Sequence, residues 1–275
     1  MTRTGDTTAP ATTSRETAHA TPPAASGDAT RPATSAGTGR AAGAGTSFEF
    51  PGRWVEGAGL VLGPSLMLAG VLLRADVDGF FPQQLAAVAA SPARMTASYS
   101  AFVAGNVLLW PAVIALARRV GRTRPVWALW GGVMVLLGLF ARTFHAGVNH
   151  LAFQLVDVQG APAAQQVMAD TYGAFHIFHT LSAAVFFGWI VLAVGTWRAG
   201  VLGIVRSVAL GLMAALPIGV LKGTGPMSVV ATLGLCVALL PLGVRVLRDG
   251  PAPRWWAYPI ALAVAAAAVL LGMAG

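Results

Sequence analysis

The uncharged stretch Met95–Ala117, MTASYSAFVAGNVLLWPAVIALA, decides the class of fold. It runs for 23 residues without a charged side chain, and a helix needs about 20 apolar residues to cross the hydrocarbon core of a bilayer. The rest of the chain is similar in character, since 56% of its residues are hydrophobic and 10% are charged. Soluble domains carry about 25% charged residues. The sequence therefore predicts an integral membrane protein.

Six further apolar segments accompany this run. They are Trp54–Leu73, Pro125 to beyond Ala141, Thr171–Trp197, Ala199–Leu221, Gly223–Val244 and Trp255–Gly275. Pro125 suits a first helical turn, where its missing N–H group would have no partner in any case. Pro111 and Pro217 fall inside segments, and we expect each to kink its helix. Residues 48–275 thus predict an all-α, polytopic bundle of seven transmembrane helices.

Residues 1–47 differ in composition from everything that follows. They contain no Leu, Ile, Val, Phe, Trp or Tyr and consist mostly of Thr, Ala, Pro, Gly and Ser. Such a segment cannot bury enough apolar area to offset the entropy lost on ordering, so we expect a disordered tail. It has no apolar core of the kind that a signal peptide requires. We predict a cytoplasmic tail that precedes the membrane domain.

The basic residues predict the orientation of the bundle. Of the 18 lysines and arginines, Arg74, Arg94, Arg142 and Lys222 fall on one side of the predicted membrane, and the other 14 fall on the other side. The positive-inside rule then places the N-terminus in the cytoplasm and the C-terminus outside. The net charge of +8 reflects this topology, so nucleic acid is not an expected partner. The single cysteine excludes an intramolecular disulfide.

Four of the five histidines lie in the segment Phe140–Leu181, which joins the third and fourth spans. His145 stands twenty residues after Pro125, about 30 Å along a helix and so near the outer interface. His176 and His179 are three residues apart and would share one helical face. Because the two helices are antiparallel neighbours, we expect these side chains to converge at the outer end of spans three and four.

This convergence gives a set of candidate site residues. The candidate catalytic residues are His145, His176, His179 and Arg142, and the candidate substrate-binding residues are Asn149, Asn106, Tyr172 and Asp157. Imidazole titrates near neutral pH and is a common metal ligand, so the histidines suit acid–base chemistry or, with all three together, a metal ion. Arg142 suits contact with an anion. Asp157 or Asp170 would orient an imidazole. In the alternative interpretation, the histidines sit at the wet interface and bond backbone or water.

The sequence leaves three functions open. One is an enzyme that acts on a lipophilic small molecule, such as a prenyl chain, quinone or lipid, by proton transfer at the histidines. A second is a small-molecule carrier or an export or immunity protein, for which broken helices around a polar site would be typical. A third is a haem or metal redox protein. The expected partners are the lipid bilayer and a lipophilic small molecule, and the sequence identifies neither a cofactor nor an oligomeric state.

Overall fold

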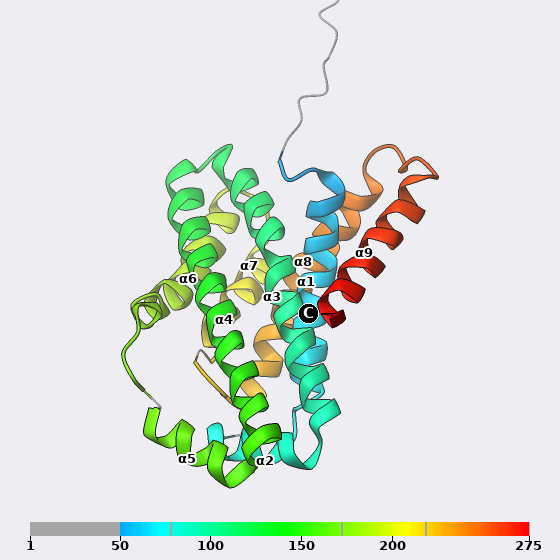
Figure 1. The fold of residues 1–275 in the computed structure, drawn as a ribbon. Coiled ribbons are helices and arrows are strands. Elements are labelled where there is room, and N and C mark those ends of the chain that lie inside the picture. Colours follow the sequence, from blue (N-terminus) through cyan, green and yellow to red (C-terminus); the bar gives the residue numbers. More distant parts are fainter. Residues whose placement is uncertain (1–49, 78, 172, 218, 275) are drawn as a thin grey trace, which may run out of the picture. The chain divides into compact units, whose positions relative to one another are not determined.

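The structure, a computed structural model, describes residues 50–77, 79–171, 173–217 and 219–274. All regular secondary structure within these ranges is helical (Figure 1). The elements are α1 (Arg53–Leu72), α2 (Phe81–Ala90), α3 (Pro92–Gly121), α4 (Pro125–Gln159), α5 (Ala161–Thr171), η1 (Ile177–His179), α6 (Ser182–Arg198), α7 (Ile204–Gly211), η2 (Leu212–Ala215), α8 (Pro226–Arg248) and α9 (Ala257–Ala274). The predicted tail, residues 1–47, lies outside the described residues.

The lengths of the helices confirm a multi-pass membrane protein. Among the described residues, six helical segments are long and apolar enough to cross a membrane: α1, α3, α4, η1 with α6, α8 and α9. The seventh predicted segment is the shorter apolar run Ile204–Ala215. The predicted start of the fourth span at Thr171 is wrong. Gly173 adopts a φ of +86°, a conformation that favours glycine, and the chain becomes helical again only at Ile177.

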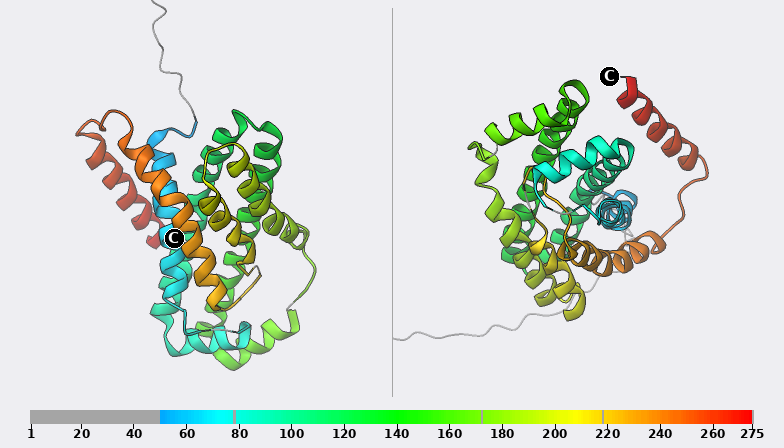
Figure 2. Two further views of the ribbon diagram at one scale, coloured as in Figure 1. Left: turned by 180° about the vertical axis from the view of Figure 1, so that it is seen from behind. Right: turned by 90° about the horizontal axis from the view of Figure 1, so that it is seen from below.

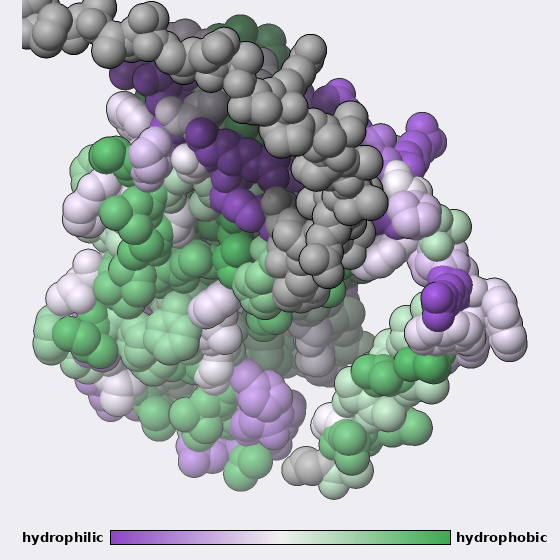
Figure 3. Space-filling view, turned by 90° about the horizontal axis from the view of Figure 1, so that it is seen from above, coloured by the Kyte–Doolittle hydropathy of each residue, from purple (hydrophilic) through white to green (hydrophobic). Residues whose placement is uncertain are grey.

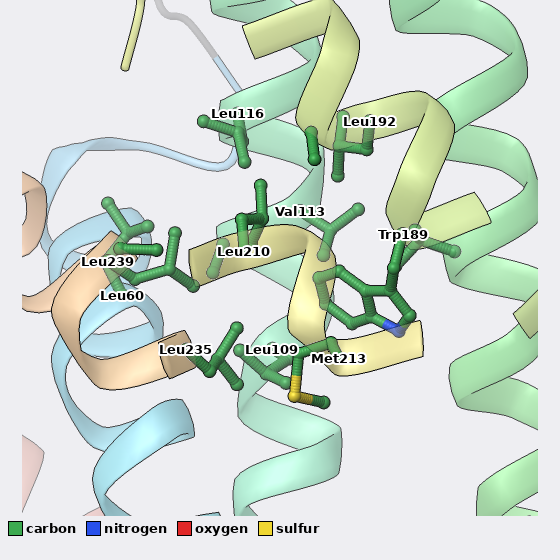
Figure 4. Close-up of a cluster of buried hydrophobic side chains, with 14 of the residues drawn as sticks. Leu60, Leu109, Val113, Leu116, Trp189, Leu192, Leu210, Met213, Leu235 and Leu239 are labelled. Atoms are coloured by element: carbon green, nitrogen blue, oxygen red, sulfur yellow. The ribbon is translucent and has the colours of Figure 1, made fainter. Parts of the chain in front are cut away.

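The main hydrophobic core lies where α1, α3, α6, α7, η2 and α8 meet. Figure 4 shows Leu60, Leu109, Trp189, Met213 and Leu235 pointing toward one another from five of these elements. Each of these side chains is at most 1% exposed. By contrast, α9 contributes no buried residue within Ala257–Ala274. The core therefore holds α1, α3, α4, α6 and α8 around α7 and η2, although α7 and η2 are too short to span a membrane themselves.

Glycines let the helices approach closely. A Cβ atom on Gly105 of α3 would lie 2.6 Å from the Gly63 carbonyl oxygen and 2.6 Å from the Met67 nitrogen, both in α1. A Cβ atom on Gly131 of α4 would lie 2.8 Å from the Leu192 backbone in α6. Lipid is as apolar as leucine, so membrane helices associate largely through such close packing.

A second hydrophobic cluster closes one end of the bundle. Figures 1 and 2 show α2 and α5 lying across the same end, and Leu85, Val88, Met95, Phe153 and Met168 pack there. Helix α2 is short, with 10 residues, and its buried residues Gln84, Leu85 and Val88 face this cluster. This end, capped by α2 and α5, also carries the link with His176 and His179. We call it the histidine end.

The opposite end, which we call the basic end, carries most of the arginines. Figure 3 looks onto it and shows hydrophilic residues gathered between hydrophobic flanks. Glu56, in the first turn of α1, is 1% exposed. It accepts a bond from Arg118 Nη2 at 2.8 Å and forms a second ion pair with Arg119. These ion pairs tie the start of α1 to the end of α3.

Candidate functional site

The fifth segment is interrupted at Pro217. Its helical part ends at Ala215, and Leu216 is extended, with φ −72° and ψ 120°. A residue that precedes proline is disfavoured in the helical conformation, and proline itself has no N–H group to donate. The predicted kink at Pro217 is thus wrong, because the helix ends there. Twelve helical residues cover only about 18 Å of a hydrocarbon core that is about 30 Å thick, so non-helical backbone continues toward the histidine end.

Side chains of α4 bind this non-helical backbone. Arg142 Nη2 donates to the Leu216 carbonyl and Nη1 to the Pro217 carbonyl, each at 3.0 Å. The Leu221 N–H group donates to Asn149 Oδ1 at 2.7 Å. Leu221 has a φ of +48°, which costs a non-glycine residue about 1–2 kcal/mol. Backbone outside a helix needs protein partners at membrane depth, and Arg142 and Asn149 supply them.

A small polar cavity of about 50 Å³ lies beside this backbone. Its ionisable and amide-bearing lining residues are Arg74, Asn106, Arg142, His145, Asn149 and Lys222. We call it the polar cavity. It joins the end of α1, the middle of α3, the outer part of α4 and the stretch that leads into α8. Three of its lining residues are cationic, and none of the described lining residues is acidic.

Arg74 is the buried cation that follows α1. It is 6% exposed, and its Nε donates to Thr224 Oγ1 at 2.9 Å. Its guanidinium carbon lies 4.0 Å from the centre of the Tyr99 ring. Burial lowers the pKa of the Arg74 guanidinium from its ordinary value, and the charge interaction with Tyr99 opposes part of this shift. Two backbone bonds, Gly223 N to Gly79 O and Thr224 N to Val77 O, hold the adjoining links together.

Sequence reasoning missed the site role of Arg74 and Lys222, which it counted only as topology charges. The sequence near Lys222 nevertheless contains a signal for irregular backbone. Between Pro217 and Pro226 the chain contains three glycines, an unusual density of helix-breaking residues inside an apolar span. Such a run indicates irregular backbone, and backbone of that kind within a membrane lines a cavity or packs against protein.

A larger cavity of about 510 Å³ adjoins the polar cavity. Its walls are mostly apolar and come from the outer part of α4, from α5 and from the link between α5 and α6; they include Phe144, Val148, Leu151, Leu155 and Met168. His145, His176 and His179 also line it, so we call it the histidine cavity. His145, Gly219 and Lys222 line both cavities. Apolar walls with a few polar groups are typical of sites for small molecules.

The three imidazoles follow one another along the histidine cavity. The centre of the His176 ring lies 5.7 Å from that of His145 and 4.3 Å from that of His179. His176 and His179 stack, with 25° between their planes. They do not share an α-helical face as predicted, because His176 precedes the 3-10 turn η1 and His179 ends it. Phe144 lies 5.0 Å from His176 between ring centres and stacks on Phe178 at 4.3 Å.

The imidazoles differ in burial. His145 is 4% exposed, His176 is half-buried and His179 is exposed. The Nδ1 atoms of His145 and His176 are buried and have no hydrogen-bond partner among the described residues. A neutral imidazole carries one donor and one acceptor nitrogen. Each of these two Nδ1 atoms therefore has hydrogen-bonding capacity that the described protein does not use.

The remaining predicted site residues separate into two groups. Asn106 lines the polar cavity and donates to the Leu139 carbonyl at 3.0 Å and to Thr143 Oγ1 at 3.1 Å. The structure does not bring the carboxylates to the histidines: Asp157 is exposed on α4 and lines neither cavity, and Asp170 accepts a bond from Gln166 at 3.0 Å. Tyr172 lies outside the described residues.

The fold and these cavities define a multi-pass helical membrane protein with a polar cavity and an adjoining apolar cavity toward one end of its bundle. Comparison of the chain with family models, with curated proteins and with solved structures gave no match. Among the residues that the structure describes, no group of three or more His, Cys, Asp or Glu side chains is arranged to hold a metal ion.

Proposed function

We propose that this protein is an enzyme of the cell membrane that acts on a lipophilic small molecule in the histidine cavity, with His145, His176 and His179 transferring protons. The observation that carries the proposal is the position of three imidazoles along one wall of an apolar cavity of about 510 Å³. Cavities that bind small molecules typically measure about 300–1,000 Å³. A prenyl chain, a quinone or a lipid tail suits such walls.

The arrangement supports proton transfer. General acid–base catalysis contributes about 10²–10⁴-fold, and imidazole is the side chain that most often performs it. His176 stacks on His179 and lies near His145, so a donor and an acceptor nitrogen can face the same substrate. Phe144 and Phe178 stack beside His176 and offer flat apolar surface to an unsaturated chain or ring.

The test begins with the molecule that copurifies with the protein. Lipophilic extracts of the purified protein are identified by mass spectrometry and compared with extracts of Val148→Trp, which fills the histidine cavity. Ala104→Trp is the matched control, because Ala104 lines a separate groove between α3 and α4. We expect Val148→Trp to lose the molecule and Ala104→Trp to retain it. Equal retention by both variants would contradict the proposed binding site.

Turnover of the identified molecule then tests the chemistry. We expect His179→Ala and His176→Ala to reduce turnover at least about 100-fold, in the range of acid–base catalysis, while both variants still fold. His150→Ala is the control, because His150 is exposed and lines the separate groove between α3 and α4. Turnover by His179→Ala and His176→Ala at the wild-type rate would exclude an acid–base role for both side chains.

A carrier is the second candidate, and the interrupted fifth segment favours it. Many transporters bind their substrate at a break between two half-helices, where backbone carbonyls and helix ends face the site. Here the break between η2 and α8 lines the polar cavity, with Leu216, Pro217 and Thr224 in its wall. Uptake of the copurified molecule, unchanged, into proteoliposomes would favour the carrier over the enzyme.

The haem or metal hypothesis stays a prediction. A visible absorption spectrum and metal analysis of the purified protein test it directly.

A further inference from the structure

Two buried guanidinium groups in the polar cavity have bonding capacity that the described protein does not use. Arg74 is 6% exposed and Arg142 is 7% exposed. Arg74 Nη1 and Arg142 Nε are buried and have no hydrogen-bond partner among the described residues. Arginine keeps its proton in proteins. A buried charge that lacks a counter-charge and full hydrogen bonding is costly, so these two cations call for an anion.

The described protein does not supply that anion. None of the described residues that line the polar cavity is acidic. Asp76, close to Arg74 in sequence, is bound instead to Arg94, with 2.8 Å between Oδ2 and Nη1. That bond holds the pKa of Asp76 below its ordinary value, so its charge is engaged outside the cavity.

Two further features favour an anion in the same place. The 23-residue helix α8 begins at Pro226, directly after the extended stretch, and its positive dipole end lies next to Thr224. The hydroxyl groups of Thr224 and Ser228 line the cavity. Thr224 Oγ1 accepts the bond from Arg74 Nε and keeps its own proton to donate. Cationic, hydroxyl and dipolar donors thus converge on about 50 Å³.

We propose that the polar cavity binds an oxyanion of the phosphate type, held by Arg74 and Arg142 with the hydroxyl groups of Thr224 and Ser228. A cavity of about 50 Å³ holds a head group and not a whole amphiphile. The adjoining histidine cavity is ten times larger and apolar. The ligand class is therefore a phosphate ester whose lipophilic tail lies in the histidine cavity, or free phosphate. Only the position of the lipophilic tail rests on the proposed function. The anion site itself is inferred from Arg74 and Arg142.

The experiment measures binding of three probes to the full-length protein in phosphate-free detergent buffer. The probes are inorganic phosphate, farnesyl phosphate and farnesol, and the readouts are calorimetric affinity and the shift of the thermal unfolding midpoint. The test variants are Arg74→Gln and Lys222→Gln. Arg94→Gln is the matched control, because Arg94 lies at the same end of the bundle as Arg74 but forms an exposed ion pair with Asp76. His179→Ala separates the anion site from the histidine chemistry.

We expect a phosphate-bearing probe to bind the wild type and Arg94→Gln equally. Loss of a buried charge partner weakens a complex strongly, so Arg74→Gln should weaken binding at least about tenfold. Lys222→Gln should also weaken binding of the phosphate-bearing probe. It takes the place of Arg74→Gln as the test variant if Arg74→Gln fails to fold. Binding of inorganic phosphate alone identifies free phosphate as a sufficient ligand. Binding of farnesyl phosphate but not inorganic phosphate identifies a lipid head group.

The anion site would be overturned if neither phosphate probe bound the wild type, or if affinity were unchanged in both Arg74→Gln and Lys222→Gln. Farnesol that binds as tightly as farnesyl phosphate would also overturn it, since the head group would then contribute nothing. His179→Ala should keep its affinity for inorganic phosphate. If this variant also keeps its turnover, the proposed enzyme chemistry fails while the anion site stands.

Discussion

Replacing Arg142 by methionine tests whether this side chain holds the interrupted fifth segment in place. Arg142 donates one bond to the Leu216 carbonyl and one to the Pro217 carbonyl, both at 3.0 Å, and it is 7% exposed. A hydrogen bond to a charged group contributes about 1.5–3 kcal/mol to stability. Methionine fills a similar volume but offers no donor. Two such bonds therefore predict a loss of about 3–6 kcal/mol.

The assay is thermal unfolding in mild detergent, followed by tryptophan fluorescence. For a domain of this size, each kcal/mol corresponds to about 2–4 °C, so the predicted loss of about 3–6 kcal/mol should lower the unfolding midpoint of Arg142→Met by about 6–24 °C. Arg94→Met is the control, because the Arg94–Asp76 pair is 41% and 63% exposed and exposed ion pairs contribute about 0–1 kcal/mol. A midpoint for Arg142→Met within about 2 °C of that for Arg94→Met would show that the extended stretch holds without Arg142.

Two further predictions concern topology and packing. A reporter fused after Gly275 should be active only if it functions outside the cytoplasm, because 14 of the 18 basic residues fall on the side assigned to the N-terminus; activity of a cytoplasm-only reporter there would mean an even number of spans. Gly105→Ala should destabilise the protein by about 1–3 kcal/mol or more, because its Cβ would lie 2.6 Å from backbone atoms of α1. Gly147→Ala, with nothing within 4 Å, should instead stabilise α4 by about 0.5–1 kcal/mol, and the same thermal assay distinguishes the two.

The fold could be predicted well because lipid imposes a simple rule on sequence. A membrane span must be long, apolar and helical, so runs such as Met95–Ala117 are recognisable without any knowledge of their partners. The partners of Glu56 were not predictable in this way, because Arg118 lies 62 positions from Glu56 in the sequence. The fifth segment was predicted less well, because its hydropathy continues past the point where Pro217 ends the helix.

The candidate site could be predicted only in part. His145, Asn149 and Arg142 recur on one face of α4, so their convergence followed from helical spacing. The hydrogen-bond partners of these residues did not follow from helical spacing. Arg142 bonds residues 74 and 75 positions away in sequence, and Arg74 bonds Thr224 across 150 positions. Nothing in local spacing indicates such pairs.

The sequence by itself determined the membrane class, the all-helical architecture and six of the seven apolar segments that are long enough to cross a bilayer, because these depend on the length and hydropathy of each run considered alone. The tertiary structure decided which polar groups share a cavity. It brought Arg74, Arg142 and Lys222 to one small cavity and left Asp157 exposed outside it. The physical reason is that a buried polar group bonds whichever donor or acceptor lies within about 3 Å of it. Here those partners come from helices that are distant in sequence, so they become neighbours only when the helices have packed.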